Sequence, residues 1–313
     1  MINIVYMATP DIAVKSLEEL FNNKDINVLA VITQPDRPKG RGNKLTPPPV
    51  KVFAIENGIE CYQTEKISKD IDLLQKLRNY SPDFFVTFAF GQILSQEVLD
   101  IPKYATINLH ASLLPKYRGA NPIQRCIYNG DTKTGITTML TVLALDAGDI
   151  CETQEIDIDE NMTDVELKEV ICNKAPNLIC STLKGLYSGE IKPKKQDETG
   201  VTIASKFTKQ DGIIDWTRSA CDIHNQVRSM VDFPCAYTMC NGKILKIMET
   251  RLTEHKENKS SSTIVNVTKS GIEVCTGNGC ILITKVKPES KGIMNAYDFA
   301  NGAKIKTDMK LGE

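Results

Sequence analysis

Short runs of apolar residues alternate with polar turns along the first half of the chain. Residues 2–8 form an apolar run of strand length, and residues 12–20 then carry apolar side chains at helical spacing after a Thr-Pro-Asp turn. Segments of the same two kinds follow, with helical spacing at 50–54 and 73–77 and strand-like runs at 27–33, 83–90, 105–110 and 135–145. This alternation predicts an α/β fold, a Rossmann-like and mostly parallel sheet with helices on both faces.

The pattern changes near residue 190. A helix expected over 163–186 ends at Ser188-Gly189-Glu190, and the following residues 192–200 have the polar, Lys-rich composition of an exposed linker. Beyond the linker we expect a helix over 219–230 and several short strands separated by Asn-Gly and Ser-Gly turns. The sequence therefore predicts a first domain over 1–191, a linker over 192–204, and a smaller OB-like β-barrel over 205–313.

Composition agrees with an ordinary globular protein. Of the 313 residues, 41% are hydrophobic and 25% charged, and no apolar run approaches the ~18 residues of a membrane helix. The N-terminus starts with the strand pattern instead of a basic and apolar leader, so we expect a cytoplasmic protein without a membrane partner. No long apolar helix demands a second subunit, and we expect a monomer.

Ten cysteines are scattered along the chain without a C-x-x-C pair. The pairs Cys235/Cys240 and Cys275/Cys280 leave a zinc site open as an alternative, but no histidine stands near them at finger spacing. The favoured interpretation is reduced thiols that pack as small apolar side chains, with no metal.

Charge is distributed unevenly. Residues 1–191 hold 19 Lys and Arg against 25 Asp and Glu, a net charge of −6, whereas residues 192–313 hold 19 against 14, a net charge of +5. A basic second half could attract a polyanion, and a solvated surface explains the same excess.

Several kinds of active site are excluded by their missing motifs. The chain has no G-x-G-x-x-G, no phosphate-binding G-x-x-x-x-G-K-[ST], no G-x-S-x-G and no H-E-x-x-H. Acid-base chemistry by histidine is limited to His110, His224 and His255. His255 stands in a charged stretch and is expected to face solvent, while His224 falls in the predicted helix of the second domain and is expected at its surface or in its packing.

His110 differs from the other two histidines because it falls on a predicted strand of the first domain. Asn108 and His110 are two residues apart on a predicted strand, so their side chains project from the same face. The loop 112–120 follows at the carboxyl end of that strand, where open α/β sheets bind ligands. Spacing alone leaves a catalytic and a structural role for His110 both open.

Three segments together carry a resemblance to a known family. They are Asn108-Leu109-His110, the run from Ser112 through Leu-Leu-Pro-Lys-Tyr-Arg to Gly119, and Leu145-Asp146-Ala147-Gly148-Asp149. The combination resembles the formyltransferases that use 10-formyltetrahydrofolate. That resemblance implies a catalytic trio of Asn108, His110 and Asp146, release of tetrahydrofolate, and folate contacts from Ser112, Leu113, Leu114 and Pro115. Phe90, after the strand 83–90, is a further candidate for the folate pocket.

Other segments bear on the second substrate. Residues 9–11, 34–51, 207–216 and 298–302 resemble the branch of the family that formylates methionine on initiator methionyl-tRNA. The loop in 34–51 holds four cations within eight residues, and guanidinium and ammonium groups suit phosphates. These candidate tRNA contacts are Arg37, Lys39, Arg41 and Lys44, and the resemblance implies Arg41 as the strongest. Two alternatives stay open at this point: a nucleotide-sugar formyltransferase, and a non-catalytic folate- or RNA-binding protein.

Overall fold

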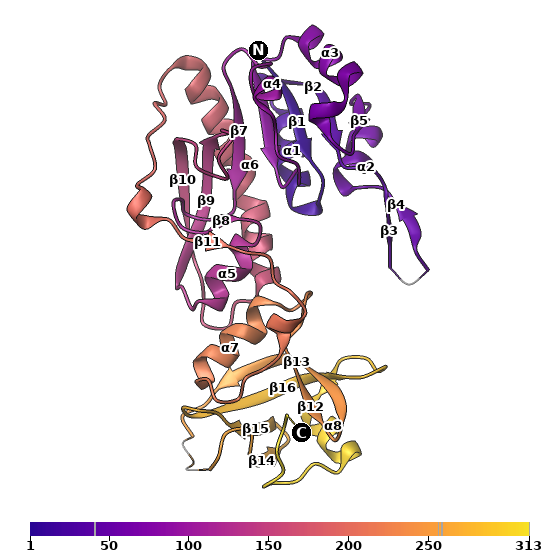
Figure 1. Cartoon of the computed structure of the whole chain (residues 1–313), viewed down its shortest axis with the longest axis vertical. Coiled ribbons are helices and arrows are strands. Elements are labelled where there is room, and N and C mark those ends of the chain that lie inside the picture. Colours follow the sequence, from indigo (N-terminus) through magenta and orange to yellow (C-terminus); the bar gives the residue numbers. More distant parts are fainter. Residues whose placement is uncertain (41, 256, 258, 313) are drawn as a thin grey trace. The chain divides into compact units, whose positions relative to one another are not determined.

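The computed structural model describes residues 1–40, 42–255, 257 and 259–312 (Figure 1). The chain divides into two compact units. Unit 1 comprises Met1–Gly119, Thr134–Ile156 and Lys168–Ile203, and unit 2 comprises Ala120–Lys133, Asp157–Leu167 and Ala204–Glu313. Two short stretches within the expected first domain thus belong to unit 2, so the units are not continuous along the chain.

A seven-stranded sheet forms the centre of unit 1, in the order β10-β9-β7-β6-β1-β2-β5 (Figure 1). Its strands are β1 (Ile2–Ala8), β2 (Ile26–Thr33), β5 (Cys61–Gln63), β6 (Phe84–Phe88), β7 (Ala105–His110), β9 (Lys133–Leu140) and β10 (Ile150–Asp157). The pairs from β5 through β7 are parallel, and β9 joins β7 antiparallel. The predicted mostly parallel sheet is confirmed.

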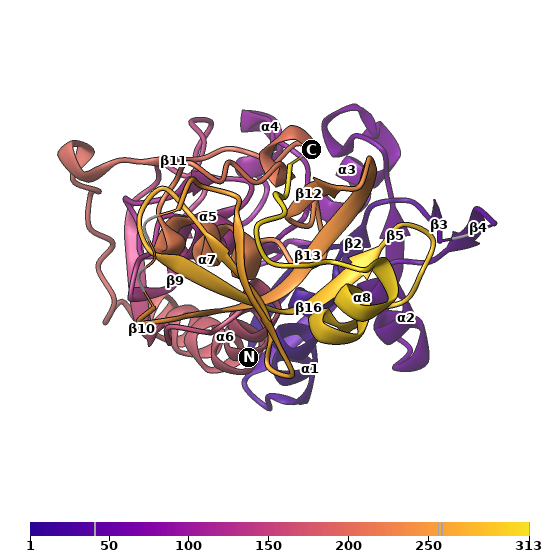
Figure 2. The ribbon, with the colours of Figure 1, turned by 90° about the horizontal axis from the view of Figure 1, so that it is seen from below.

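Helices cover both faces of this sheet. They are α1 (Val14–Asn22), α2 (Pro49–Glu56), α3 (Ile71–Tyr80), α4 (Gln96–Leu99) and α6 (Asp164–Ser188). Alternate residues of β1 point to opposite faces: the Tyr6 hydroxyl donates to the carbonyl of Ala13 just before α1, whereas Val5 and Met7 pack with α3 and α4. Helix α6 lies beside α1 (Figure 2). Lys168 of α6 pairs with Asp11 just before α1, and Lys184 of α6 pairs with Asp25 just after it.

Smaller elements complete unit 1. The cationic loop forms a hairpin of β3 (Arg37–Lys39) and β4 (Lys44–Thr46), and β8 (Arg118–Gly119) pairs with β11 (Ile203–Ala204). In the described residues, single turns of 3₁₀ helix are η1 (Asp11–Ala13), η2 (Ile67–Lys69), η3 (Glu198–Gly200) and η4 (Gln210–Gly212), the last of which lies in unit 2.

Unit 2 is built on an antiparallel sheet. Its strands are β12 (Tyr237–Cys240), β13 (Lys243–Leu252), β14 (Ile264–Thr268), β15 (Gly271–Cys275), β16 (Cys280–Pro288) and β17 (Met294–Asn295), and its helices are α5 (Pro122–Tyr128), α7 (Ala220–Ser229) and α8 (Ala296–Ala303). Ser219 and Asp222 form a capping box that begins α7.

The C-terminal segment joins the two edge strands of this sheet. The amide of Gly312 donates to Met239 O in β12 at 2.8 Å, and the amide of Ile264 in β14 donates to Met309 O at 2.8 Å. The expected barrel is therefore an antiparallel sheet whose edges are joined through residues 309–312.

One strand is shorter than the sequence pattern predicts. The apolar run 135–145 predicts an extended chain throughout, but β9 ends at Leu140, whose amide donates to Asp149 O at 2.9 Å. The amide of Thr141 still donates to Thr106 O of β7 at 2.8 Å, and residues 142–148 then form a loop because the chain turns back to begin β10. Val142, Leu143 and Leu145 in this loop are exposed.

Candidate active site

Asn108 and His110 lie at the carboxyl end of β7, as the strand pattern predicts. In the sheet, Asn108 is aligned with Thr87 of β6 and with Met139 of β9. The Thr87 hydroxyl donates to Asn108 Oδ1 at 2.8 Å. Since this bond occupies the oxygen end of the amide, its nitrogen is the end offered to a ligand, as a hydrogen-bond donor.

The His110 ring is held in one orientation. It is 5% exposed, and Nε2 lies 2.8 Å from the carbonyl oxygen of Tyr117. A carbonyl oxygen only accepts, so Nε2 carries the proton of the neutral ring and Nδ1 is the nitrogen left for substrate chemistry. His110 Nδ1 is 3.6 Å from Asp146 Oδ2. The carboxylate is thus placed to balance a positive charge on the imidazole.

Asp146 reaches His110 from the loop after β9. Its backbone has φ +48°, in the left-handed region that Asp tolerates better than most residues, and its Oδ2 accepts the Gly119 amide at 2.8 Å. Gly119 itself has φ +119°, a conformation that favours glycine. Two of the three predicted catalytic side chains therefore converge, and the third occupies the same strand as His110.

Gly148 makes this loop possible. A Cβ atom added there would lie 1.7 Å from the Leu140 carbonyl oxygen. The glycine of the Asp-Ala-Gly segment therefore has a packing role, because it lets the loop approach the last residue of β9.

The predicted folate-contacting loop lies against β9. Thr137 Oγ1 donates to Ser112 O at 2.7 Å and accepts the Leu114 amide at 3.1 Å. The Ser112 hydroxyl donates to Lys116 O, and both Ser112 and Leu114 are buried. Of the four predicted folate contacts, Leu113 and Pro115 are half-buried and so are the two with side chains partly accessible to a ligand. Folate contact by these four residues stays a prediction.

Phe90 lies in the core of unit 1. Its side chain is 4% exposed and belongs to the cluster formed with Val5, Leu94 and Val98. Its carbonyl oxygen accepts from Gln34 Nε2 and from Thr9 Oγ1, both at 3.3 Å. The ring thus has a structural role, and a folate contact by Phe90 stays a prediction.

Three of the four predicted tRNA-contacting residues lie on the β3–β4 hairpin, and Arg41 lies outside the described residues. The register aligns Lys39 with Lys44 and Arg37 with Thr46, so the three cations share one face of the hairpin. All three are exposed, and Arg37 pairs with Glu65 at 2.6 Å. The Lys51 ammonium anchors the hairpin base through Asp36, at 2.9 Å.

The other two histidines have structural contacts. His224 is 2% exposed, with Nδ1 at 2.9 Å from Thr250 Oγ1 and Nε2 at 3.0 Å from Glu160 O. Burial lowers the pKa of His224, although the Glu160 carbonyl acts in the opposite direction. His255 is exposed, as expected, and contacts Glu273.

The described residues contain no group of three or more His, Cys, Asp or Glu side chains placed to hold a metal ion. The ten cysteines all lie in the described part of the chain and form no disulfide there. Within residues 1–40, 42–255, 257 and 259–312, no helix has the length and apolar character needed to cross a bilayer.

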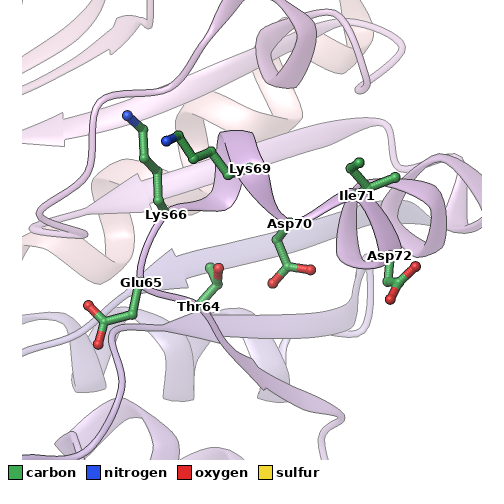
Figure 3. Close-up of a pocket in the computed structure, with 7 residues that line it drawn as sticks. All are labelled: Thr64, Glu65, Lys66, Lys69, Asp70, Ile71 and Asp72. Carbon is green, nitrogen blue, oxygen red and sulfur yellow. The ribbon is translucent and has the colours of Figure 1, made fainter.

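A surface hollow of about 670 Å³ lies between η2 and α3, and no residue of the trio lines it. Figure 3 shows Lys66 and Lys69 pointing to one side of it and Glu65 and Asp70 to the other. Asp70 also accepts the Leu73 amide as the cap of α3. Because charges of both signs line the hollow and Asp70 caps a helix, its lining does not favour one class of ligand.

Sequence reasoning missed two residues that support the trio. Arg118 and Gln196 are 7% and 9% exposed and are hydrogen-bonded to each other. Gln196 stands in the stretch interpreted as an exposed linker, and its burial corrects that interpretation locally. Arg118 follows Tyr117 in the loop after β7. Its position within a loop that the sequence already associates with the site is the signal that could have identified it.

Comparison with known proteins places the chain in a family. The profile described as Formyl transferase matches residues 2–183, and that described as Formyl transferase, C-terminal domain matches residues 206–304. The methionyl-tRNA formyltransferase of Clostridium novyi is 43% identical over 98% of this chain and 99% of its own length. That of Clostridium acetobutylicum is 45% identical over 97% and 98%. The chain belongs to the methionyl-tRNA formyltransferase family.

A solved structure shares the fold at lower identity. WlaRD, a sugar 3N-formyl transferase solved in the presence of dTDP and 5-N-formyl-THF, superposes with a TM-score of 0.68 at 20% identity, over 93% of this chain and 99% of its own. The fold is therefore common to formyltransferases with different acceptors, whereas the full-length identity of over 40% points to the methionyl-tRNA formyltransferases.

Proposed function

We propose that this enzyme transfers the formyl group of 10-formyltetrahydrofolate to the α-amino group of methionine on initiator methionyl-tRNA. The observation that carries the proposal is the meeting of His110 Nδ1 and the Asp146 carboxylate, 3.6 Å apart, at the end of the strand that also holds Asn108. Membership of the family supplies the two substrates. The reaction takes place in the cytoplasm under this proposal, where aminoacyl-tRNA is used.

Formyl transfer places particular demands on a site. The uncharged amine attacks the formyl carbon, a new C–N bond forms, and an oxyanion develops on the tetrahedral carbon. The bond between that carbon and folate N10 then breaks, the amine nitrogen loses a proton, and N10 gains one. The products are the formylated amine and tetrahydrofolate. The site must therefore stabilise an oxyanion and transfer a proton.

The trio can meet these demands with its own atoms. The Asn108 amide nitrogen and a protonated His110 Nδ1 act as donors to the oxyanion, and Asp146 offsets the positive charge of the imidazole. The Asp146 carboxylate accepts the proton of the amine, directly or through a water molecule, and the same proton then passes to N10 as its bond to the formyl carbon breaks. The Tyr117 carbonyl fixes the ring so that Nδ1 faces this reaction space. No step requires a metal.

Recognition of tRNA is assigned to the β3–β4 hairpin. Like charges directly opposite each other on a two-stranded ribbon repel, so the Lys39–Lys44 pair is stabilised when a phosphate lies between the two ammonium groups. Arg37 adds a third cation to the same face. The hairpin is thus suited to the sugar-phosphate backbone, and its role is independent of the trio.

The test is formylation by the purified chain with 10-formyltetrahydrofolate and charged initiator tRNA. We expect formylmethionyl-tRNA as product, and we expect Asn108→Ala and His110→Ala to lower kcat by about 10²–10³-fold, the usual effect of losing an oxyanion donor. The matched control is His255→Ala, because His255 is an exposed histidine of unit 2. A folded His110→Ala protein with the kcat of the parent would refute the assigned site.

The competing acceptors are tested in the same assay. An amino-sugar nucleotide replaces methionyl-tRNA in one series, and both acceptors are omitted in another. Formylation of the sugar nucleotide alone would make the chain a sugar formyltransferase. Binding of folate and tRNA without any product would make it a binding protein.

A further inference from the structure

Gln196 lies in a stretch with the composition of a linker, yet its side chain is buried among the loops that carry the site. Its Nε2 donates to the carbonyl oxygen of Asp146 at 2.8 Å and to that of Gly148 at 2.7 Å. A single amide group thus holds both ends of the turn on which the Asp146 carboxylate stands.

The other end of the same amide binds the loop after β7. Gln196 Oε1 accepts from Arg118 Nε at 3.1 Å and from Arg118 Nη2 at 2.8 Å. Arg118 lies between Tyr117, whose carbonyl orients His110, and Gly119, whose amide binds Asp146 Oδ2. Gln196 therefore connects the segment that orients the imidazole to the segment that presents the carboxylate.

We propose that Gln196 is a positioning residue for formyl transfer, which fixes Asp146 relative to His110 by bridging their two loops. The inference rests on the proposed function of Asp146. Both polar ends of a glutamine are required: the amide nitrogen satisfies two carbonyls, and the amide oxygen satisfies the guanidinium. A carboxylate would repel the two carbonyls, and an apolar side chain would leave all three groups without this partner.

Gln196→Met tests the proposal because methionine keeps the length of the side chain without its hydrogen bonds. A loosened turn displaces the carboxylate, and displacements of the order of 1 Å can lower rates by about 10²-fold, so we expect kcat to fall by about 10- to 100-fold. Since Gln196 is not assigned to tRNA binding, the KM for methionyl-tRNA is expected to change by less than about twofold.

Glu198→Gln is the matched control. Glu198 binds the same guanidinium, with Oε1 at 2.9 Å from Arg118 Nη2 and Oε2 at 3.3 Å from Arg118 Nη1, but its side chain is 71% exposed. We expect this variant to keep the kcat of the parent. An equal loss in Glu198→Gln and Gln196→Met would assign the effect to Arg118 anchoring and overturn the proposal.

A double-mutant cycle separates positioning from general stability. If Gln196 acts through the Asp146 carboxylate, Gln196→Met lowers kcat in the parent but changes it by less than about twofold in an Asp146→Asn background. Additive losses would show that Gln196 acts elsewhere. If Asp146→Asn alone keeps the parental kcat, the assigned catalytic role fails and this inference with it. If Asp146→Asn is impaired and Gln196→Met is not, only this inference fails.

Hydrogen exchange gives a readout that does not depend on turnover. The amides of residues 141–149 are expected to exchange faster in Gln196→Met than in the parent or in Glu198→Gln, since the variant lacks the two bonds that hold the turn. Unchanged exchange in this loop would overturn the proposal even if kcat had fallen.

Discussion

Substitution of Gly148 by alanine tests how closely the Asp146 loop is fixed. The added Cβ would lie 1.7 Å from the Leu140 carbonyl oxygen, whereas real Cβ atoms essentially never approach a heavy atom within 3.0 Å. The backbone must therefore move by at least about 1.3 Å, the difference between these two distances. Leu140 cannot yield freely because its amide is bonded to Asp149 O.

This displacement is expected to act on both catalysis and folding. The turn that moves holds Asp146, so its carboxylate shifts relative to His110 Nδ1, and we expect kcat to fall by about 10²-fold. The overpacking itself is expected to lower the free energy of unfolding by about 1–3 kcal/mol. Both quantities are measurable on the full chain, by single-turnover formylation and by urea unfolding.

The control for Gly148→Ala is Gly292→Ala. No atom lies within 4 Å of the Cβ that this second substitution adds, so it tests the general effect of removing a glycine. We expect it to leave kcat unchanged. A Gly148→Ala protein with parental turnover would show that the position of the carboxylate does not matter, and the reasoning on this loop would be wrong.

Two further predictions concern other parts of the chain. Joint substitution of Lys39 and Lys44 by alanine should raise the KM for tRNA at unchanged kcat. The slope of log KM against log salt concentration should fall by about 1 for each phosphate that is no longer bound. Lys69→Ala is the control and should change neither the KM nor this slope. For His224, burial and the nearby Arg228 and Arg251 lower the folded-state pKa, while the unfolded state takes up a proton near pH ~6.5. The free energy of unfolding should therefore fall as the pH drops below ~6.5, and less so in His224→Gln; equal pH dependence in urea titrations would contradict this.

The parts of the fold that follow from local pattern were predictable. β1 begins and ends where its apolar run does, because strands buried on both faces read as nearly continuous apolar segments. β7 covers the strand-like run that the sequence predicts over 105–110. The period of two along β7 also predicts that Asn108 and His110 share one face. The local residue pattern was therefore sufficient to predict the position of these strands and the shared face of Asn108 and His110.

The hydrophobic pattern gave wrong predictions where contacts with a distant segment determine the structure. The run 135–145 is apolar to its end, but β9 stops at Leu140 because the chain turns back to pair with Asp149. The glycines and prolines around the cations of residues 37–44 predict an irregular loop, yet this segment forms a hairpin that the Lys51–Asp36 ion pair anchors at its base. Neither interaction leaves a signal in the local composition.

Gln196 illustrates the same limit at the site itself. Its neighbours Lys194, Lys195 and Asp197 have the character of a solvated linker, and the glutamine differs from them only through bonds to residues 48, 50 and 78 positions earlier. Burial of an uncharged amide costs little when all its hydrogen bonds are made, whereas the charged neighbours must stay in solvent. The composition of the segment describes the buried glutamine and its exposed neighbours together, so it cannot predict that Gln196 alone is buried.

The positions of His110 and Asp146 depend on contacts between segments that are far apart in the sequence. His110 and Asp146 are each placed by a bond to the loop after β7: the ring by the Tyr117 carbonyl, and the carboxylate by the Gly119 amide. The loops that hold Tyr117 and Asp146 are not long regular elements that would keep their shape alone. The arrangement of His110 and Asp146 therefore exists only once the sheet has brought residues 110, 119, 146 and 196 together. Under the proposed function, Gly119, Gly148 and Gln196 help to set this arrangement without contacting substrate.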